Sequence, residues 1–175
     1  MPTVILDAGH GGSDFGAMYQ GRLEKDDNLA LTLAVGDILA ANGINVLFTR
    51  TTDIYETPTA KALEGNASGA DYFISIHRNS SPIPNQYTGI ESLVYNRNST
   101  AGNIARNINR NLEAIGFANQ GVNERRNLAV LRRTTMPAVL VEAGFINNDR
   151  DNELFDAQFD AIAQAIADGI LETVF

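Results

Sequence analysis

The sequence contains no cysteine and only two histidines, so the chemistry open to it is narrow. Without cysteine the chain can form no disulfide, and it offers no thiolate as a nucleophile or metal ligand. Any metal site must therefore be built from histidine, aspartate, glutamate or water. The two imidazoles, His10 and His77, are the first residues to consider for catalysis.

The chain also lacks an excess of basic residues. Its 13 lysines and arginines are outnumbered by 21 aspartates and glutamates, which gives a net charge of −8 at pH 7. Phosphate backbones and anionic lipids are bound through a basic field, which an acidic chain does not provide. We therefore expect no nucleic acid and no membrane among its partners.

Long apolar runs are missing as well. No run reaches the roughly 18 residues that a transmembrane helix needs, and Met1 is not followed by the basic and apolar regions of a signal peptide. With 175 residues, the chain is long enough to bury a core of its own. We expect a single domain spanning residues 1–175.

Alternating apolar patterns predict an α/β fold, with a mixed or mostly parallel sheet flanked by helices. Strands are expected at residues 3–6, 44–49, 72–76, 89–95, 127–131 and 138–141. Helices are expected at 24–42, 58–68 and 100–115, with a last helix carrying Phe155, Phe159, Ile162 and Ile166. Thr57, and either Ser99 or Thr100, fit the N-cap position, while Gly43, Gly69 and Gly116 fit helix ends.

Three of the expected strands end in a residue that can do chemistry. "VILDAGH" ends at His10, "YFISIH" ends at His77, and "AVLVE" ends at Glu142. Ligands in open α/β sheets bind at the carboxyl ends of the strands, where parallel strands bring such residues together. A single histidine at the end of a strand is common in protein structures. The two histidines and Glu142 together, each at the end of a strand, predict a metal or acid–base site.

Two imidazoles and a carboxylate suit zinc best, with water in an open fourth position. The third protein ligand is left open by the residues themselves. Glu24 can be brought near His10 if the loop 11–23 folds back, although an acid in a helix's first turn is also favoured by the helix dipole. The competing carboxylates are those of Asp7, Asp14, Asp26 and Glu91.

The glycine-rich stretch "GHGGSDFG" is not a phosphate-binding loop. No Gly-Lys-Ser/Thr follows it, and counted from Gly9 the third position of G-x-G-x-x-G is occupied by Asp14. We expect the glycines to leave the backbone around His10 open to close approach.

Several segments match, in order, the motifs of one enzyme family. They are "ILDAGHGGSDFGA", "EKDDNL", "VLFTRTTD", "GADYFISIHRNS" and "NLAVLRRTTMPAVLVEAGFINN". With these motifs the chain resembles, from end to end, the zinc-dependent N-acetylmuramoyl-L-alanine amidases of amidase type 3, which degrade bacterial cell walls. The order of several motifs makes this match far more specific than any single one.

The resemblance implies an α/β fold of the phosphorylase/hydrolase-like type. It implies a Zn²⁺ ion held by His10, Glu24 and His77, with Glu142 as the catalytic acid/base. The implied substrate is peptidoglycan, cut at the amide between N-acetylmuramic acid and the first L-alanine of the stem peptide.

The chain departs from the family pattern at Arg78, where the family often has alanine, and in the segment "TPTAKALEGNASGAD". Arg78, Asn79 and Arg132, with Arg133 beside it, are expected to contact substrate. Asp7 is the expected partner that fixes a histidine tautomer.

Two other functions stay open at this point. One is a zinc peptidase or carboxypeptidase that cuts elsewhere in the stem peptide, and the other is a catalytically silent wall-binding module. For the amidase we expect action at the cell wall, outside the cytoplasm, as a holin-released phage endolysin or a trimmed secreted domain. A wall-binding module is expected, if present, outside this chain.

Overall fold

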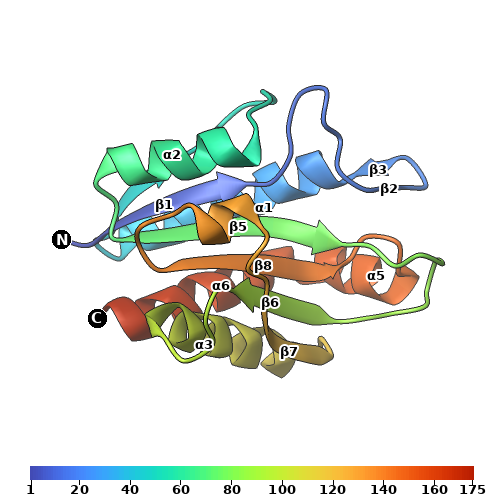
Figure 1. The fold of residues 1–175 in the computed structure, drawn as a ribbon. Helices are drawn as coiled ribbons and strands as arrows, with labels where there is room; N and C mark the ends of the chain where they lie inside the picture. The colour runs from blue at the N-terminus through green and yellow to red at the C-terminus, as the bar shows by residue number, and fades with distance from the viewer.

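The computed structural model describes residues 1–175 and places one twisted sheet between two layers of helices (Figure 1). The sheet has six strands in the order β4-β1-β5-β8-β6-β7. They are β1 (Thr3–Ala8), β4 (Asn45–Phe48), β5 (Tyr72–Asn79), β6 (Ile90–Val94), β7 (Asn119–Glu124) and β8 (Ala138–Phe145). Two short strands, β2 (Met18–Tyr19) and β3 (Arg22–Leu23), form a separate antiparallel hairpin.

The sheet is mixed, as the sequence predicts. Strands β4, β1, β5 and β8 run parallel to one another, β6 runs antiparallel to β8, and β7 runs parallel to β6. Although β8 is the last strand in the chain, it lies between β5 and β6. The carboxyl ends of β1, β5 and β8 therefore lie side by side at the same end of the sheet.

Helices cover both faces of the sheet (Figure 1). The larger core, of 26 buried residues, lies under α1 (Glu24–Ala41), α3 (Thr100–Ala114) and α6 (Phe159–Val174). A smaller core of 8 buried residues lies on the opposite face, where α2 (Pro58–Ser68) meets α4 (Ala129–Arg132). Helix α5 (Asp149–Ala157) follows β8.

Strand alternation decides which side chains reach each face. Along β5, Ile74 and Ile76 join the larger core, and Phe73 joins the smaller one. Ser75 and His77 therefore project, like Phe73, toward the face that carries α2 and α4. On β8, Leu140 belongs to the smaller core, so Glu142 projects to that same face.

The predicted helix ends are largely confirmed. Thr57 caps α2 by accepting a hydrogen bond from the Ala60 backbone N–H at 3.1 Å, and Gly69 ends that helix with φ of 74°. Ser99, rather than Thr100, caps α3 by accepting from the Gly102 N–H at 3.2 Å.

Two predictions of secondary structure are wrong. Residues 127–131 form no strand: the last three of them belong to the short helix α4, and the sixth strand is β7. The run "NLAVL" is apolar and short, a pattern that periodicity cannot assign to strand or helix. The last helix is also not continuous, because α5 ends and α6 begins around Gln158.

None of the helices combines the length and the apolar character needed to span a membrane.

Candidate active site

The site begins where β1 ends. Gly9 donates its N–H to the Ile76 carbonyl at 3.0 Å, so the chain after β1 stays beside β5. A Cβ at Gly9 would overlap the His77 imidazole, so only glycine allows the backbone to pass there. The next residue, His10, has a φ of 63°, a left-handed conformation uncommon for residues other than glycine.

Two buried cations, Lys61 and Arg50, contact the backbone just before this turn. Lys61 lies 2.9 Å from the Asp7 carboxylate and donates to the Ala8 carbonyl at 2.9 Å. Arg50 donates to the carbonyls of Ala8 and Gly9, each at 3.1 Å. These charged side chains therefore fix the backbone carbonyls that directly precede the strained residue His10.

Asp14 orients the His10 ring. Its Oδ2 lies 2.8 Å from His10 Nδ1, while its Oδ1 accepts from the Gly16 N–H at 3.1 Å. A carboxylate facing Nδ1 favours a proton on that nitrogen, which leaves Nε2 as the ring atom free to bind a metal. His10 Nε2 points at Glu24 Oε2, 2.7 Å away.

Glu24 is the first residue of α1, and it is buried with only 3% of its surface exposed. Each carboxylate oxygen accepts a backbone hydrogen bond: Oε2 from Ala17 N–H and Oε1 from Arg78 N–H, both at 3.2 Å. A Cβ at Gly16 would overlap the Glu24 carboxylate, so a second glycine is required where the loop crosses this residue.

His77 completes the cluster. Its Nδ1 lies 3.6 Å from Glu24 Oε1, and its ring meets that of His10 edge-on, with centroids 5.0 Å apart. Ligand atoms of His10, Glu24 and His77 all lie within 4.8 Å of one another, as a metal ion would require. Two imidazoles and a carboxylate are a donor set suited to zinc.

None of the four competing carboxylates belongs to this cluster, and Asp14 instead faces the other ring nitrogen of His10. Asp7 accepts hydrogen bonds from Thr49 and Ser75 besides its ion pair with Lys61, and none from a histidine. The expectation that Asp7 fixes a histidine tautomer is therefore wrong, and Asp14 occupies that position. Asp26 is exposed, and Glu91 accepts a hydrogen bond from Asn123.

The close approach of His10 and Glu24 shifts their pKa values in opposite directions. Burial alone would lower the pKa of His10, but hydrogen bonds and charges from Glu24 and Asp14 raise it to about 9. Burial would raise the pKa of Glu24, but the two histidines hold it well below its usual range. Glu24 is thus a carboxylate that stays ionised at all ordinary pH values.

Glu142 stands beside this cluster on the neighbouring strand. It is the direct register partner of His77 in the β5–β8 pair, and it lies opposite Glu91 on β6. Its Oε2 is buried and has no hydrogen-bond partner. Burial, with a smaller effect from the charges of Glu24 and Glu91, raises the pKa of Glu142 to about 7. Such a carboxyl group can both take and return a proton near neutral pH.

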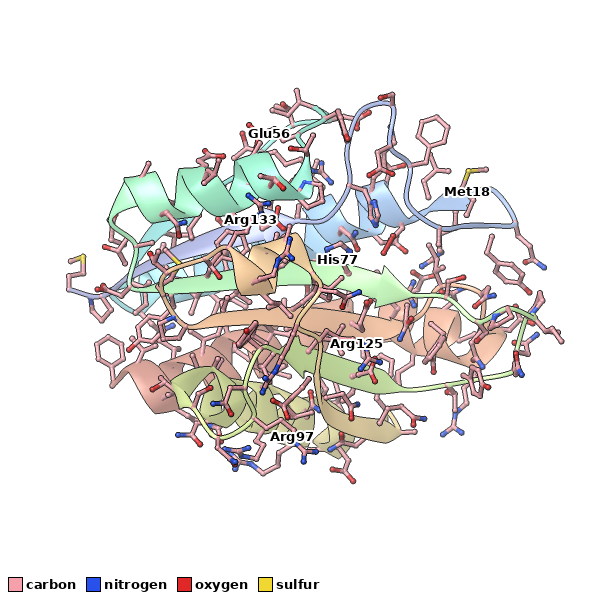
Figure 2. All side chains as sticks on the ribbon, viewed as in Figure 1. Met18, Glu56, His77, Arg97, Arg125 and Arg133 are labelled. Carbon is pink, nitrogen blue, oxygen red and sulfur yellow. The ribbon has the colours of Figure 1, made fainter.

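A cavity of about 470 Å³ opens onto the cluster. His10 and His77 line its floor, Glu56 and Lys61 line it from the α2 side, and residues 127–130 close it on the α4 side. His77 and Glu56 are labelled in Figure 2. A cavity of this volume falls in the range of small-molecule binding sites, and it reaches both histidines.

The three residues expected to contact substrate lie in different surroundings. The Arg78 side chain is buried on the opposite face, where its guanidinium donates to Asp27 and Asn152 and lies 4.1 Å above the Phe155 ring. Arg78 serves the site only through its backbone N–H to Glu24. Asn79 is half-buried at the end of β5, and Arg132 is exposed at the end of α4.

Known protein sequences resemble this chain over nearly its full length. Residues 4–172 match the sequence model of a family described as N-acetylmuramoyl-L-alanine amidase. The amidase CwlM of Bacillus licheniformis is 36% identical over 97% of this chain and 66% of its own length. The sporulation-specific amidase of Bacillus subtilis is also 36% identical, over 97% of this chain and 67% of its own length.

Solved structures show the same fold. An N-acetylmuramoyl-L-alanine amidase from Clostridium difficile 630 superposes with a TM-score of 0.93 at 31% identity, covering 99% of this chain and 96% of that one. The catalytic domain of CwlV from Bacillus (Paenibacillus) polymyxa gives a TM-score of 0.91 at 36% identity, over 99% and 98% of the two chains. The present chain spans about two thirds of the length of the curated relatives it matches.

Proposed function

The chain belongs to the N-acetylmuramoyl-L-alanine amidase family, and from this premise we propose that it is a peptidoglycan hydrolase. The bond cut is the amide between N-acetylmuramic acid and the first L-alanine of the stem peptide. Residues 1–175 act as the catalytic domain, at the cell wall outside the cytoplasm. A wall-binding module, where one exists, lies outside these residues.

The proposed cofactor is Zn²⁺, held by His10, Glu24 and His77. The support is the clustering of their ligand atoms within 4.8 Å and the chemistry of this donor set. When bound, zinc supplies Lewis acidity toward a carbonyl oxygen and lowers the pKa of water.

Glu142 is the proposed catalytic acid/base. Its carboxylate takes the proton from the attacking water and returns it to the amine nitrogen of the departing alanine. The observation that carries the proposal is the buried Glu142 Oε2 without a partner, one strand away from His77. A buried acceptor left unpaired is costly for the fold, and a group that must exchange protons with a substrate accounts for it.

The remaining residues position these groups. Asp14 holds the His10 ring, and the backbone N–H groups of Ala17 and Arg78 hold the Glu24 carboxylate. Asn79 and Arg132 remain proposed substrate contacts. The Arg78 side chain is not among the proposed substrate contacts, because its guanidinium is buried on the opposite face of the sheet.

Replacing Glu142 by glutamine tests the proposal. The Glu142→Gln variant should bind zinc as the wild type does, yet lose at least about 100-fold in hydrolysis of purified peptidoglycan, because the amide cannot take a proton. Mass spectrometry of wild-type digests should show intact stem peptides beginning with L-alanine. Fragments cut within the stem peptide would instead identify a peptidase, and wild-type rates in the variant would remove Glu142 from catalysis.

A histidine variant provides the complementary test. His10→Ala should lower the bound zinc measured by elemental analysis, because one of three protein ligands is lost. Unchanged zinc content in this variant would exclude His10 as a ligand.

A further inference from the structure

Exposed positive charge is concentrated in one part of this acidic chain. Residues 95–137 hold seven of its 13 basic residues but only two of its 21 acidic ones. Four of the six remaining basic residues are buried, namely Lys25, Arg50, Lys61 and Arg78. Arg22 forms ion pairs with Asp27 and Asp156, so Arg150 is the one exposed and unpaired cation outside the segment.

Within the segment, several guanidinium groups have no partner in the protein. Arg97, Arg132 and Arg133 are exposed, and their side chains form no hydrogen bond or ion pair. Arg125 donates only to a backbone carbonyl, and Arg126 pairs with Glu124 while 63% of its side chain stays exposed. We call Arg97, Arg125, Arg126, Arg132 and Arg133 the arginine surface.

The arginine surface is continuous with the catalytic cavity. Residues 127–130 line that cavity, while Leu131 and Arg132, which follow directly in the chain, line a second hollow of about 370 Å³. The loop 95–99 forms the far wall of this hollow, and Arg126 stacks on Tyr95 at 5.1 Å from its ring centroid. In Figure 2, His77, Arg133, Arg125 and Arg97 lie on the face turned toward the viewer.

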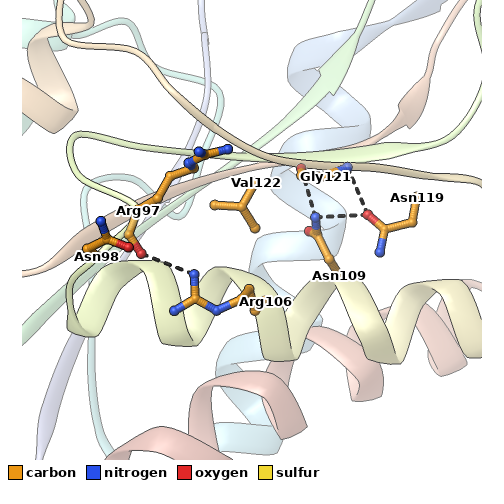
Figure 3. A pocket seen from close by; sticks show the side chains of 7 residues that line it. All are labelled: Arg97, Asn98, Arg106, Asn109, Asn119, Gly121 and Val122. Carbon is orange, nitrogen blue, oxygen red and sulfur yellow. Dashed lines mark hydrogen bonds between the residues drawn. The ribbon is translucent and has the colours of Figure 1, made fainter.

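A third hollow lies beyond this loop. It measures about 400 Å³ and is lined by Arg97 and Arg106 together with polar side chains from α3 and β7 (Figure 3). Three hollows thus follow one another from the catalytic cavity across α4 and the loop 95–99, and the two outer ones carry arginine.

The chemistry of this surface fits a carboxylate-bearing polymer. Every cation in the segment is arginine, whose planar fork binds carboxylates through two hydrogen bonds at once. The acidic remainder of the protein repels a polyanion, so such a polymer would approach by this face.

We propose that the arginine surface binds stem-peptide carboxylates of the peptidoglycan around the scissile bond. The inference rests on the proposed function. Because the surface starts at the cavity into which the stem peptide must enter, stem-peptide carboxylates fit it better than phosphodiester polymers of the wall.

Binding to purified walls tests this without hydrolysis. In a Glu142→Gln background, Arg97→Ala, Arg132→Ala and Arg133→Ala together should weaken co-sedimentation with walls about tenfold, taking each exposed contact as modest. Arg133→Ala is also measured alone, with Arg150→Ala as its matched control, since both remove one exposed positive charge. Arg150→Ala should change wall binding less than about twofold. Raising the salt concentration from about 0.05 M to about 0.5 M should weaken wall binding more in the parent protein than in the triple variant.

Two treated wall preparations identify the partner. Walls whose carboxylates have been converted to amides should bind the parent protein as weakly as untreated walls bind the triple variant. Walls stripped of phosphodiester polymers should bind it as untreated walls do. Loss of binding to the stripped walls, or equal binding by the triple variant and the Arg150→Ala control, would overturn the inference. Neither result alters which bond the wild-type enzyme cuts, so this proposal and the proposed function can fail separately.

Discussion

At the scale of single residues, the orientation of His10 depends on Asp14. The 2.8 Å contact between Asp14 Oδ2 and His10 Nδ1 fixes which ring nitrogen faces Glu24. We expect Asp14→Asn to weaken zinc binding about 10- to 100-fold, the usual effect of losing such a partner. Competition with a chromogenic chelator measures this affinity. Asp26→Asn is the control, because Asp26 is exposed, and an equal loss in that variant would contradict the assignment.

Asp7 links the site to stability at low pH. Burial alone would raise its pKa, but the charges of Lys61 and His77 and the Ser75 hydroxyl hold the pKa below its ordinary value of 3.8. A group with a lowered folded-state pKa stabilises the fold above its unfolded pKa, and this contribution is lost as pH falls through the folded value.

Urea unfolding of wild type and Asp7→Asn measures this contribution. We expect the free energy of unfolding to be lower in the variant by about 3 kcal/mol at neutral pH, because Lys61 is left buried without its partner. The difference should persist down to about pH 4 and shrink below it. A difference independent of pH would mean that the Asp7 charge does not stabilise the fold.

The sequence predicts the position of a site residue only where a recognisable pattern surrounds that residue. The meeting of His10, His77 and Glu142 could be predicted, because each follows an apolar strand. The roles of Asp14 and Lys61 could not, since their side chains act across loops and between elements. The sequence places Arg78 next to His77, but the Arg78 side chain lies on the other face of the sheet, because sequence neighbours in a strand point to opposite faces. The metal and catalytic roles themselves remain predictions.

At the scale of elements, the start of α3 allows a direct test of capping. The sequence leaves Ser99 and Thr100 equally suitable, and the structure places the accepting hydroxyl on Ser99. Ser99→Ala should lower the free energy of unfolding by about 1 kcal/mol, whereas Thr100→Ala should change it by less than about 0.5 kcal/mol. Thermal or urea unfolding distinguishes them, and a larger effect at Thr100 would show that the cap is misassigned.

The incorrect strand prediction at residues 127–131 and the unpredicted strand β7 also concern whole elements. Val130 and Leu131 are buried in the smaller core through a single helical turn, which a strand pattern imitates. Strand β7 is an edge strand with a largely polar sequence, "NQGVNE", and contains no fully buried side chain. Tertiary packing against β6 and α3 makes it a strand, and local propensity does not reveal this.

At the scale of the whole molecule, the proposed zinc ligands tie together segments that are distant in the chain. His10 follows β1, Glu24 begins α1, and His77 lies on β5. Zinc at about 100 times its dissociation constant should therefore raise the free energy of unfolding by about 2.7 kcal/mol, provided that it binds only the folded chain. Calorimetry with added zinc should show this gain in Glu142→Gln and its loss in His77→Ala. Equal gains in both variants would argue against the proposed site.

The position of β8 determines when the four residues of the proposed site can come together during synthesis. His10, Glu24 and His77 all belong to the first half of the chain, so the ribosome delivers them early. Glu142 arrives on the last strand, which must be inserted between two strands already made. The growing polypeptide therefore cannot assemble all four groups until its sheet is complete. A chain built in this order gains the complete proposed site only after its last strand is in place.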